Sequence, residues 1–590
     1  MLGKIIGTNE NTVLLKLSID LNNTTNLTNM YVLMDSNSNR IVGEINDIND
    51  GIAYINLVGE VIDNKFVFGV IKKPDFNAVV KLIPKESVKA IISVSNYNEK
   101  QDLYLGKSPI YDGVDIYANI DSFFSNHFSI FGSTGSGKSC SVSRLFQNLF
   151  SKQNALAYNS NIFIFDAYGE YHSAFTNLNQ ISPKLNFKAY TTDLTFGDSE
   201  ILQIPLWLLS VDDIALLLEA NNHSQLPIIE KALKYVNVFA REETDVIKVK
   251  DDIIARVLLD IMSSGKPSSQ IRDQIFSILS HYNTKNLNLD SIVTQPGYNR
   301  PLRQCFVIDA SGKIREMELI TNFFEKFLQD SIELSMPDGS FMYTLNDLKD
   351  AFDFALISEG ILNSTKIYDD CNVLKVRLNS LVNGEYSNYF KCKEYVTKEQ
   401  FIKNLLTASN GEKAQIVNFN INYIDDRFAK TITKIYSKLL FDYAKGLDQK
   451  ASQPFHIVLE EAHRYVQNDN DINLLGYNIF ERISKEGRKY GVLLGLISQR
   501  PSEISATCLS QCNNFLIFKM IHPKDISYIE EMISNITSSD IKRIKILQPG
   551  MCMAFGTAFK VPVIIKFDMP NPAPDSSSCQ VSNIWFENNN

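Results

Sequence analysis

The sequence predicts an α/β protein whose core is a parallel sheet, with a small β-barrel before the core and helical segments inserted into it. Three observations predict this class. Short β-branched runs separated by Asn, Asp and Gly clusters fill the first 92 residues, which is typical of a small barrel or sandwich. From His127 onward strands alternate with helices, which favours a parallel sheet. Two long helical stretches, about 210–300 and 315–385, interrupt this alternation.

Length and composition set the broad class. The chain has 590 residues, of which 44 % are hydrophobic and 21 % are charged, so we expect a soluble globular protein with several domains. It has no run of eighteen apolar residues and no basic amino-terminal region before a long apolar stretch, so we expect no membrane helix and no secretory signal. Eight scattered cysteines fit reduced thiols in a cytoplasm. The net charge of −9 excludes a coat of basic patches, but it is compatible with a confined basic channel for nucleic acid.

The expected domain boundaries lie where the residue pattern of the sequence changes. The boundaries that we expect are 1–92 for the β-barrel, 93–209 for the first part of the α/β core, 210–300 for a helical insertion, 301–314 for a core strand, 315–412 for a second helical insertion, 413–569 for the second part of the core and 570–590 for an extended Pro/Ser/Asn-rich tail. Within the first part of the core, residues 93–125 look like a connector with turns.

Short apolar runs bounded by polar residues predict the core strands. These runs are HFSIF from residue 127, NIFIFD from 161, RQCFVIDAS from 303, AQIVNFNI from 414, HIVLE from 456, VLLGLIS from 492, NFLIFKM from 514 and VPVIIKF from 561. Apolar residues at helical spacing, among them Val142, Leu145 and Phe146, predict a helix after the first of these strands. Ser210, three residues before Asp213, predicts a helix start with a capping arrangement.

One motif carries phosphate chemistry. Residues 132–139 read GSTGSGKS and match G-x-x-x-x-G-K-[ST] between a predicted strand and a predicted helix. Glycines let successive backbone N–H groups face a phosphate, and the helix N-terminus adds partial positive charge. We therefore expect ATP and Mg²⁺ as cofactors, with Lys138 on the β- and γ-phosphates and Ser139 on the metal. The residues that we expect at the nucleotide are Gly132, Ser133, Thr134, Gly135, Ser136, Gly137, Lys138, Ser139, Cys140 and Asp166.

Two adjacent carboxylates, Glu460 and Glu461, follow the strand that begins at His456. Ionised acids at the end of a buried strand are costly unless a cation compensates them. A phosphate-binding loop needs an acid for the Mg²⁺ shell and a second group that orients the attacking water, both at the carboxyl edge of the sheet. We therefore predict that Glu460 is the Walker-B acid and a metal ligand and that Glu461 is the catalytic base. The alternative is a solvated strand end.

Further polar residues follow other strands. Gln499 comes after VLLGLIS, where it either senses the γ-phosphate or caps the next segment. Arg482, Arg488 and Arg500 cluster between the glutamates and this glutamine, and a ring ATPase needs one arginine that reaches the γ-phosphate of a neighbour. Asp166 ends another strand, where a loop-capping role is as well supported as a phosphate role.

Three further residues carry weaker patterns. Cys508, Cys512 and His522 match no zinc spacing well. His463 and Arg464 receive no chemistry from the sequence.

The motifs together resemble HerA, in the FtsK/HerA branch of ring ATPases. The resemblance rests on GSTGSGKS, DAYGEY, IPLWLLSVDD at 204–213, LEEAHRY, EGRKYGVLLGLISQRP and PGMCMAFGTAFKVPVIIKF, in an order that matches along nearly the whole chain. It implies a RecA-like P-loop ATPase core, the preceding barrel and a tail that braces a neighbouring subunit. By position, Glu460 and Glu461 form the Walker B, Gln499 is the sensor, and Arg482 or Arg488 acts in trans.

The resemblance also implies a function. A cytoplasmic homo-hexamer would use ATP to translocate double-stranded DNA, with a nuclease or a sirtuin-like or other effector protein as partner and no membrane. The large insertions and the acidic balance favour a member that acts in antiviral defence over one that processes DNA ends in repair. The alternative hypothesis is a nucleotide-regulated ring scaffold that controls an effector enzyme without processive translocation. A conjugative coupling ATPase ranks last, because such proteins usually carry membrane helices.

Overall fold

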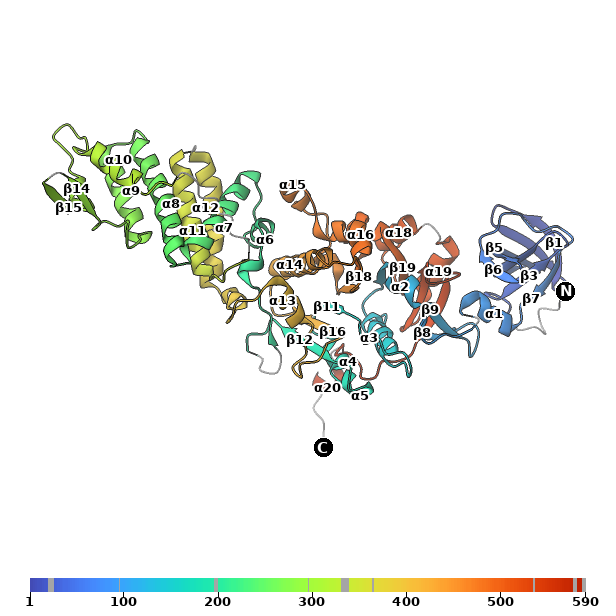
Figure 1. The fold of residues 1–590 in the computed structure, drawn as a ribbon. Helices are drawn as coiled ribbons and strands as arrows, with labels where there is room; N and C mark the ends of the chain where they lie inside the picture. The colour runs from blue at the N-terminus through green and yellow to red at the C-terminus, as the bar shows by residue number, and fades with distance from the viewer. Residues whose placement is uncertain are drawn as a thin grey trace. The chain divides into compact units, whose positions relative to one another are not determined.

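The computed structural model describes residues 1–19, 26–94, 96–195, 200–295, 297–329, 339–362, 365–533, 536–576 and 581–585. It divides into two compact units (Figure 1). One unit holds Met1–Ile201, Ile402–Asp469 and Tyr477–Asn590, and the other holds Leu202–Phe401 and Asn470–Gly476.

The N-terminal strands form the expected β-barrel. The strands are β1 Gly3–Thr8, β2 Thr12–Leu17, β3 Tyr31–Asp35, β4 Arg40–Asn49, β5 Ile52–Ile62, β6 Lys65–Phe68 and β7 Val79–Leu82. They pair in the order β1-β2-β5-β4-β3-β7, with β6 on β5. The Leu2 N–H donates to the Val80 carbonyl at 2.9 Å and joins the two ends of the sheet. Alternating side chains such as Val13, Leu15 and Ile55 fill the interior, because one face of each strand points inward.

A twelve-stranded sheet forms the core of the first unit, in the order β13-β12-β16-β11-β17-β18-β10-β19-β20-β21-β8-β9. The strands are β8 Asp102–Lys107, β9 Asp115–Asn119, β10 His127–Phe131, β11 Ile162–Asp166, β12 Phe187–Thr191, β13 Glu200–Ile201, β16 Ile416–Asn420, β17 Phe455–Leu459, β18 Val492–Ser498, β19 Cys512–Phe518, β20 Met551–Gly556 and β21 Val563–Phe567. Pairing is parallel from β13 to β19 and antiparallel from β19 to β9. The carboxyl ends of the parallel strands therefore share one edge.

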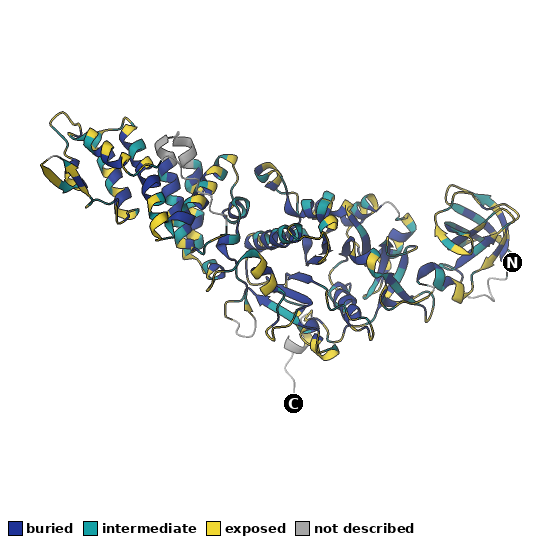
Figure 2. Cartoon of the chain, in the orientation of Figure 1, coloured by how far each residue is buried: buried dark blue, intermediate teal, exposed yellow. Residues whose placement is uncertain are grey.

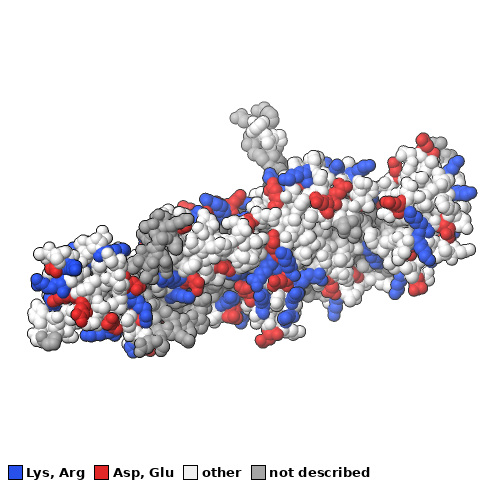
Figure 3. Space-filling view, turned by 90° about the horizontal axis from the view of Figure 1, so that it is seen from above, with Lys and Arg blue, Asp and Glu red and all other residues white. Residues whose placement is uncertain are grey.

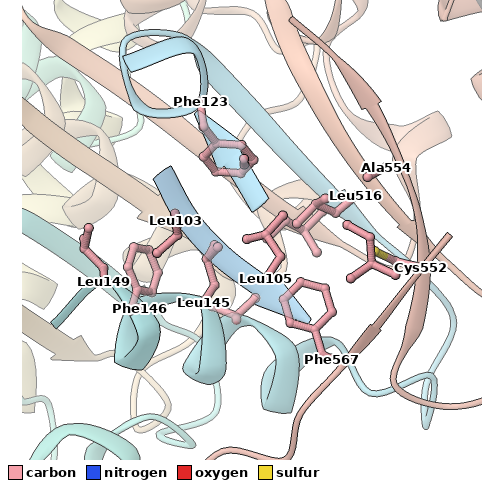
Figure 4. Packing of buried hydrophobic residues seen from close by; sticks show 14 of the residues in the cluster. Leu103, Leu105, Phe123, Leu145, Phe146, Leu149, Leu516, Cys552, Ala554 and Phe567 are labelled. Carbon is pink, nitrogen blue, oxygen red and sulfur yellow. The ribbon is translucent and has the colours of Figure 1, made fainter. Parts of the chain in front are cut away.

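Helices cover this sheet. They include α1 Lys85–Ile92, α2 Ile120–Phe124, α3 Lys138–Phe150, α4 His172–Phe175, α5 Leu178–Ile181, α14 Asp426–Lys445, α16 Ile479–Tyr490, α17 Ala506–Ser510, α18 Pro523–Met532 and α19 Ser538–Ile546. The apolar face of α3, with Leu145, Phe146 and Leu149, packs against Leu103 and Leu105 of β8 (Figure 4). Both central strands β17 and β18 are buried along their whole length (Figure 2).

The second unit is mainly helical. Its helices include α6 Val211–Leu217, α7 Leu226–Phe239, α8 Thr244–Ser263, α9 Ser268–His281, α10 Met317–Glu325, α11 Leu345–Leu362 and α12 Thr365–Asn383. The short helix α15 Asp471–Leu475 also belongs to this unit, and the boundary between the two units falls within α13 Lys398–Leu405. Ser210 and Asp213 form the predicted capping box at the start of α6. No helix in the described part of the chain is both long and apolar enough to cross a bilayer.

Three segments differ from the expectation. RQCFVIDAS was expected as a core strand, but Leu302–Cys305 form a 3₁₀ helix and the run lies outside the twelve-stranded sheet. Its apolar residues pack instead in the core of the helical unit, which apolarity alone does not distinguish from a strand. The helical stretch to residue 300 ends in a hairpin, β14 Ile292–Gln295 and β15 Tyr298–Pro301. The connector 93–125 contains β8, β9 and α2, which complete the antiparallel side of the core.

The tail was expected to be extended. Residues 570–576 carry no helix or strand, whereas Val581–Trp585 form the short helix α20. The rest of the predicted tail, 577–580 and 586–590, lies outside the described residues.

Candidate functional site

The phosphate-binding motif forms the loop between β10 and α3, as the sequence predicts. Gly135 and Gly137 adopt φ of +73° and +92°, a left-handed conformation that glycine reaches without steric cost. A Cβ added at Gly137 would lie 2.7 Å from the amide nitrogen of Gly550. The Gly550 N–H also donates to the Ser136 carbonyl at 2.9 Å, so a second loop supports this turn. The motif glycines are thus required by the backbone path around α3.

Lys138 begins α3 and is folded back over the loop. Its ammonium donates to the carbonyl of Gly132 at 2.7 Å and to that of Ser133 at 3.2 Å. Burial lowers the pKa of Lys138, and the carboxylates of Glu461 and Glu460 act in the opposite direction. The amine therefore lies between the phosphate loop and the paired glutamates, where phosphate oxygens would be its natural partners.

The paired glutamates follow β17 and are both buried. Burial, with the carboxylates of Asp166 and Glu170, raises the pKa of Glu460 well above its ordinary value. Burial also acts to raise the pKa of Glu461, but hydrogen bonds from His463 and Gln499 outweigh it and lower that pKa. Glu461 has φ of +48°, which is uncommon for a residue with a side chain. Two adjacent acids are thus tuned in opposite directions, a pattern typical of acids with different roles.

Gln499 connects the phosphate loop to Glu461. Its amide nitrogen donates to Glu461 Oε1 at 2.5 Å, and its amide oxygen accepts from the Thr134 hydroxyl at 2.5 Å. β18 lies between β10 and β17, so the residue that follows it comes between the loop and the glutamates. The Arg500 N–H is capped by the Ser498 hydroxyl at 2.9 Å rather than by Gln499. Gln499 is thus bonded to the phosphate loop and to Glu461, and its role as a γ-phosphate sensor stays a prediction.

Asp166 is fully buried and its carboxylate holds the loop that follows β11. It accepts the backbone N–H groups of Glu170 at 3.0 Å and Tyr171 at 2.9 Å, and the Asn418 side-chain amide at 3.2 Å. These bonds correspond to the loop-capping alternative. The Ser139 hydroxyl is a hydrogen-bonding neighbour of Glu170, whose pKa burial raises.

A divalent cation fits the chemistry of this edge. Ser139 supplies a hydroxyl, and Glu460 supplies a buried carboxylate whose Oε2 has no hydrogen-bond partner within the described residues. Oxygen ligands of this kind suit Mg²⁺, which binds through few protein groups and the phosphates of its nucleotide. One of the two predicted metal ligands, Glu460, therefore has an acceptor oxygen that the described residues leave free at the carboxyl edge of the sheet, where the cation is expected.

The three arginines have different surroundings. Arg482 lies over the rings of Phe441 and Tyr477, at 5.9 and 5.2 Å from their centroids. Arg488 is exposed in the last turn of α16. Arg500 pairs with Glu503 at 3.0 Å. The choice between Arg482 and Arg488 as the arginine that acts on a neighbour stays a prediction.

Cys508 and Cys512 are buried, whereas His522 is exposed. Burial raises the pKa of both Cys508 and Cys512 to about 12, and His522 pairs with Asp525 at 3.1 Å. Over the described ranges no three His, Cys, Asp or Glu side chains are grouped as metal ligands.

His463 received no role from the sequence, but it is part of the site. Its Nδ1 lies 3.2 Å from Glu461 Oε2 and 3.0 Å from the Ser498 hydroxyl. Only its position two residues after Glu461 could have indicated this contact.

The chain is similar in sequence to known helicases. Residues 103–327 match the family model of the central domain of helicase HerA. The DNA double-strand break repair helicase HerA of Sulfolobus acidocaldarius is 24 % identical over 586 residues, which cover 94 % of this chain and 91 % of that one. A probable helicase of Methanocaldococcus jannaschii is 29 % identical over 195 residues, or 32 % of this chain and 38 % of its own length. Among solved structures, VirB4 of Thermoanaerobacter pseudethanolicus aligns with 80 % of this chain and 98 % of its own at 14 % identity, with a TM-score of 0.42.

Proposed function

Because the chain is a HerA-type protein along most of its length, we propose that it is an ATP-hydrolysing ring motor that translocates double-stranded DNA. The observation that carries this proposal is the link from Thr134 of the phosphate loop through Gln499 to Glu461. A base whose position depends on a residue of the phosphate loop is what a nucleotide-driven motor needs, because hydrolysis must respond to the γ-phosphate.

The residues assign the chemical steps. Backbone N–H groups of residues 132–139 bind the phosphates, and Lys138 turns from its loop carbonyls to the β- and γ-phosphates. Ser139 and Glu460 would hold Mg²⁺, which when bound would neutralise part of the phosphate charge. Glu461, kept ionised by His463 and Gln499, orients the attacking water and accepts its proton.

The oligomer and its partners follow from the same family. A homo-hexamer gives each nucleotide an arginine from the neighbouring subunit, Arg482 or Arg488. The relative from Sulfolobus acidocaldarius is named for DNA double-strand break repair, which supports double-stranded DNA as substrate. On the face drawn in Figure 3, acidic side chains lie among the basic ones, which gather in one denser group. A confined basic region is what we expect if DNA phosphates bind in the pore of a ring, whereas a generally basic surface is not required.

The effector partner is a nuclease or a sirtuin-like or other enzyme in the cytoplasm. The helical insertion and the acidic balance favour a role in antiviral defence over DNA-end processing. A regulated scaffold that controls such an effector without translocation is the second candidate, because the same catalytic residues also serve a switch.

The proposal is tested by ATP hydrolysis with and without linear double-stranded DNA at about 50 and 200 mM salt, a range over which phosphate contacts weaken strongly. Stimulation by DNA that fades at the higher salt, and is absent in Lys138→Ala, supports the motor. Hydrolysis that ignores DNA but changes when an effector protein is added supports the scaffold. A protein that hydrolyses no ATP under any of these conditions contradicts both.

A further inference from the structure

Three carboxylates at the nucleotide site have an oxygen that is shielded from solvent and lacks a hydrogen-bond partner among the residues that the structure describes. They are the buried Glu460 and Glu461 and the half-buried Glu170, each through its Oε2. Glu170 is among the groups that raise the pKa of Glu460, and the Ser139 hydroxyl is a hydrogen-bonding neighbour of Glu170. Buried acceptors without donors are rare in folded proteins and indicate a missing cation or donor.

The other acids at this edge are already engaged. Asp166 accepts two backbone N–H groups and a side-chain amide, so its oxygens are satisfied. Glu461 accepts from Gln499 through Oε1, and its Oε2 lies 3.2 Å from His463 Nδ1, so each of its two oxygens faces a protein side chain. Glu170 is thus the carboxylate that remains available next to Ser139 and Glu460.

A hydroxyl at this position supports the same interpretation. The Tyr171 hydroxyl is also unsatisfied in the described structure, and none of this side chain is exposed. Burial raises its pKa, and the carboxylates of Glu460 and Glu170 are among the groups that raise it further. A hydroxyl and carboxylates that lie close together suit a hydrated divalent cation, whose water ligands donate to several acceptors.

A chain segment far away in sequence fixes the backbone of Glu170. We name residues 568–575 the C-terminal strap, and it crosses α3 and α4 of the same chain. Asp568 accepts from the Tyr104 hydroxyl at 2.9 Å and lies 3.8 Å from Arg144 of α3. Two hydrogen bonds join the strap to the side-chain amide of Gln147 in α3. The Asn571 N–H donates to the oxygen of this amide at 3.0 Å, and its nitrogen donates to the Pro572 carbonyl at 2.8 Å.

The end of the strap reaches the site itself. The Ser173 hydroxyl donates to the Ala573 carbonyl at 2.9 Å, and the Asp575 N–H donates to the Glu170 carbonyl at 2.9 Å. The Glu170 N–H is meanwhile held by Asp166 at 3.0 Å. Glu170 is therefore fixed on both sides of its Cα, by its own loop and by the strap, and this limits where its carboxylate can lie.

We propose that Glu170 is a further carboxylate of the Mg²⁺ site, which together with Glu460 would hold the hydration shell of the cation, and that the C-terminal strap positions it. This inference rests on the proposed function, because it assigns a residue to the cation of the same nucleotide. It goes beyond the motif residues, since Glu170 lies outside both the phosphate loop and the Walker-B pair.

The test uses Mn²⁺ as the probe, titrated by electron paramagnetic resonance into the full-length protein with ADP. We expect Glu170→Gln to weaken Mn²⁺ binding by at least about tenfold, the size of effect that loss of an outer carboxylate has at metal sites. ADP binding without a metal should stay within about twofold of the wild-type affinity, because Glu170 lies outside the phosphate loop at residues 132–139. Metal-free ADP binding also reports that the variant is folded.

The outcomes separate the inference from the proposed function. Mn²⁺ affinity of Glu170→Gln equal to that of the wild-type protein would overturn the inference and leave the ATPase proposal intact. Failure of the wild-type protein to bind ADP would overturn both. If Glu170→Gln does not fold, Glu170→Asp replaces it, and an unchanged Mn²⁺ affinity in that variant, whose carboxylate is one methylene shorter, again contradicts the inference.

The strap has its own matched pair of variants. Asp575→Pro removes the N–H that holds the Glu170 carbonyl, whereas Asp575→Ala keeps it. We expect Mn²⁺ binding in the presence of ADP to weaken several-fold in Asp575→Pro and to stay at the wild-type level in Asp575→Ala. Equal affinities in the two variants would show that the strap does not position Glu170.

Discussion

Replacing Gln499 by alanine would break the link between the phosphate loop and the proposed base. Gln499 donates to Glu461 and accepts from Thr134, each at 2.5 Å, so the variant loses one bond to a charged group and one to a neutral hydroxyl. A hydrogen bond to a charged group contributes about 1.5–3 kcal/mol. If that bond aligns Glu461 in the transition state, the hydrolysis rate should fall about 10- to 150-fold. ATP affinity should change little, because the lost bonds lie between protein groups.

The pH dependence gives a second readout of the same change. The Gln499 amide helps to lower the pKa of Glu461 against the effect of burial. Its removal raises that pKa, and the base works only in its ionised form. The acid limb of the pH–rate profile should therefore move to higher pH in Gln499→Ala, and the rate deficit should be largest on the acid side.

The assay is steady-state ATP hydrolysis across pH, with ATP affinity measured separately. Gln511→Ala is the matched control, since Gln511 is exposed and precedes β19 at the opposite edge of the sheet. A Gln499→Ala enzyme with the wild-type rate and pH profile would refute the assignment. So would an equal loss of rate in the control variant.

Three further predictions test other parts of the structure. Gly137→Ala should abolish ATP binding, because the new Cβ would lie 2.7 Å from the Gly550 nitrogen at a φ of +92°; calorimetric titration checks this. Glu460→Gln should unfold at a higher temperature than the nucleotide-free wild type at pH 8 but not at pH 4. Because the folded protein raises the pKa of Glu460, the folded state is favoured while this carboxyl is protonated and loses that stability as the pH rises. The amide of the variant does not titrate and keeps its stability at pH 8. Arg543→Ala should lower the free energy with which the barrel packs on the core by about 3 kcal/mol, because it leaves Glu44, 2.9 Å from Arg543, largely buried without its cation. Limited proteolysis of the barrel measures this loss, and a Glu44→Gln/Arg543→Ala double variant should lose less.

The parts of the site that could be predicted are those in which chemistry and local sequence coincide. The loop at 132–139 is a contiguous motif, and Glu460 and Glu461 directly follow an apolar run that is bounded by polar residues and predicts a buried strand. Their common edge then follows from parallel pairing. Gln499 was placed by the same rule, since it follows another core strand.

The parts that could not be predicted depend on contacts between distant segments. Glu170 becomes a site residue through its neighbour Ser139 and through Asp575, which is more than four hundred residues away in sequence. The strap along α3 has no periodicity, so the tail could only be expected to be extended. RQCFVIDAS was wrong as a strand for a related reason, because an apolar run fits the core of a helical unit as well as it fits a sheet.

Single-turnover cleavage of ATP by the wild-type protein and by Glu461→Gln would show whether Glu461 is the base. Both proteins should bind ATP with affinities within about threefold of each other, because Glu461 acts on the water and not on the nucleotide. Cleavage in the variant should be slower by about 10²–10⁴-fold, the range that general-base catalysis contributes. Cleavage at the wild-type rate in Glu461→Gln, or a wild-type protein that binds ATP and never cleaves it, would contradict the account.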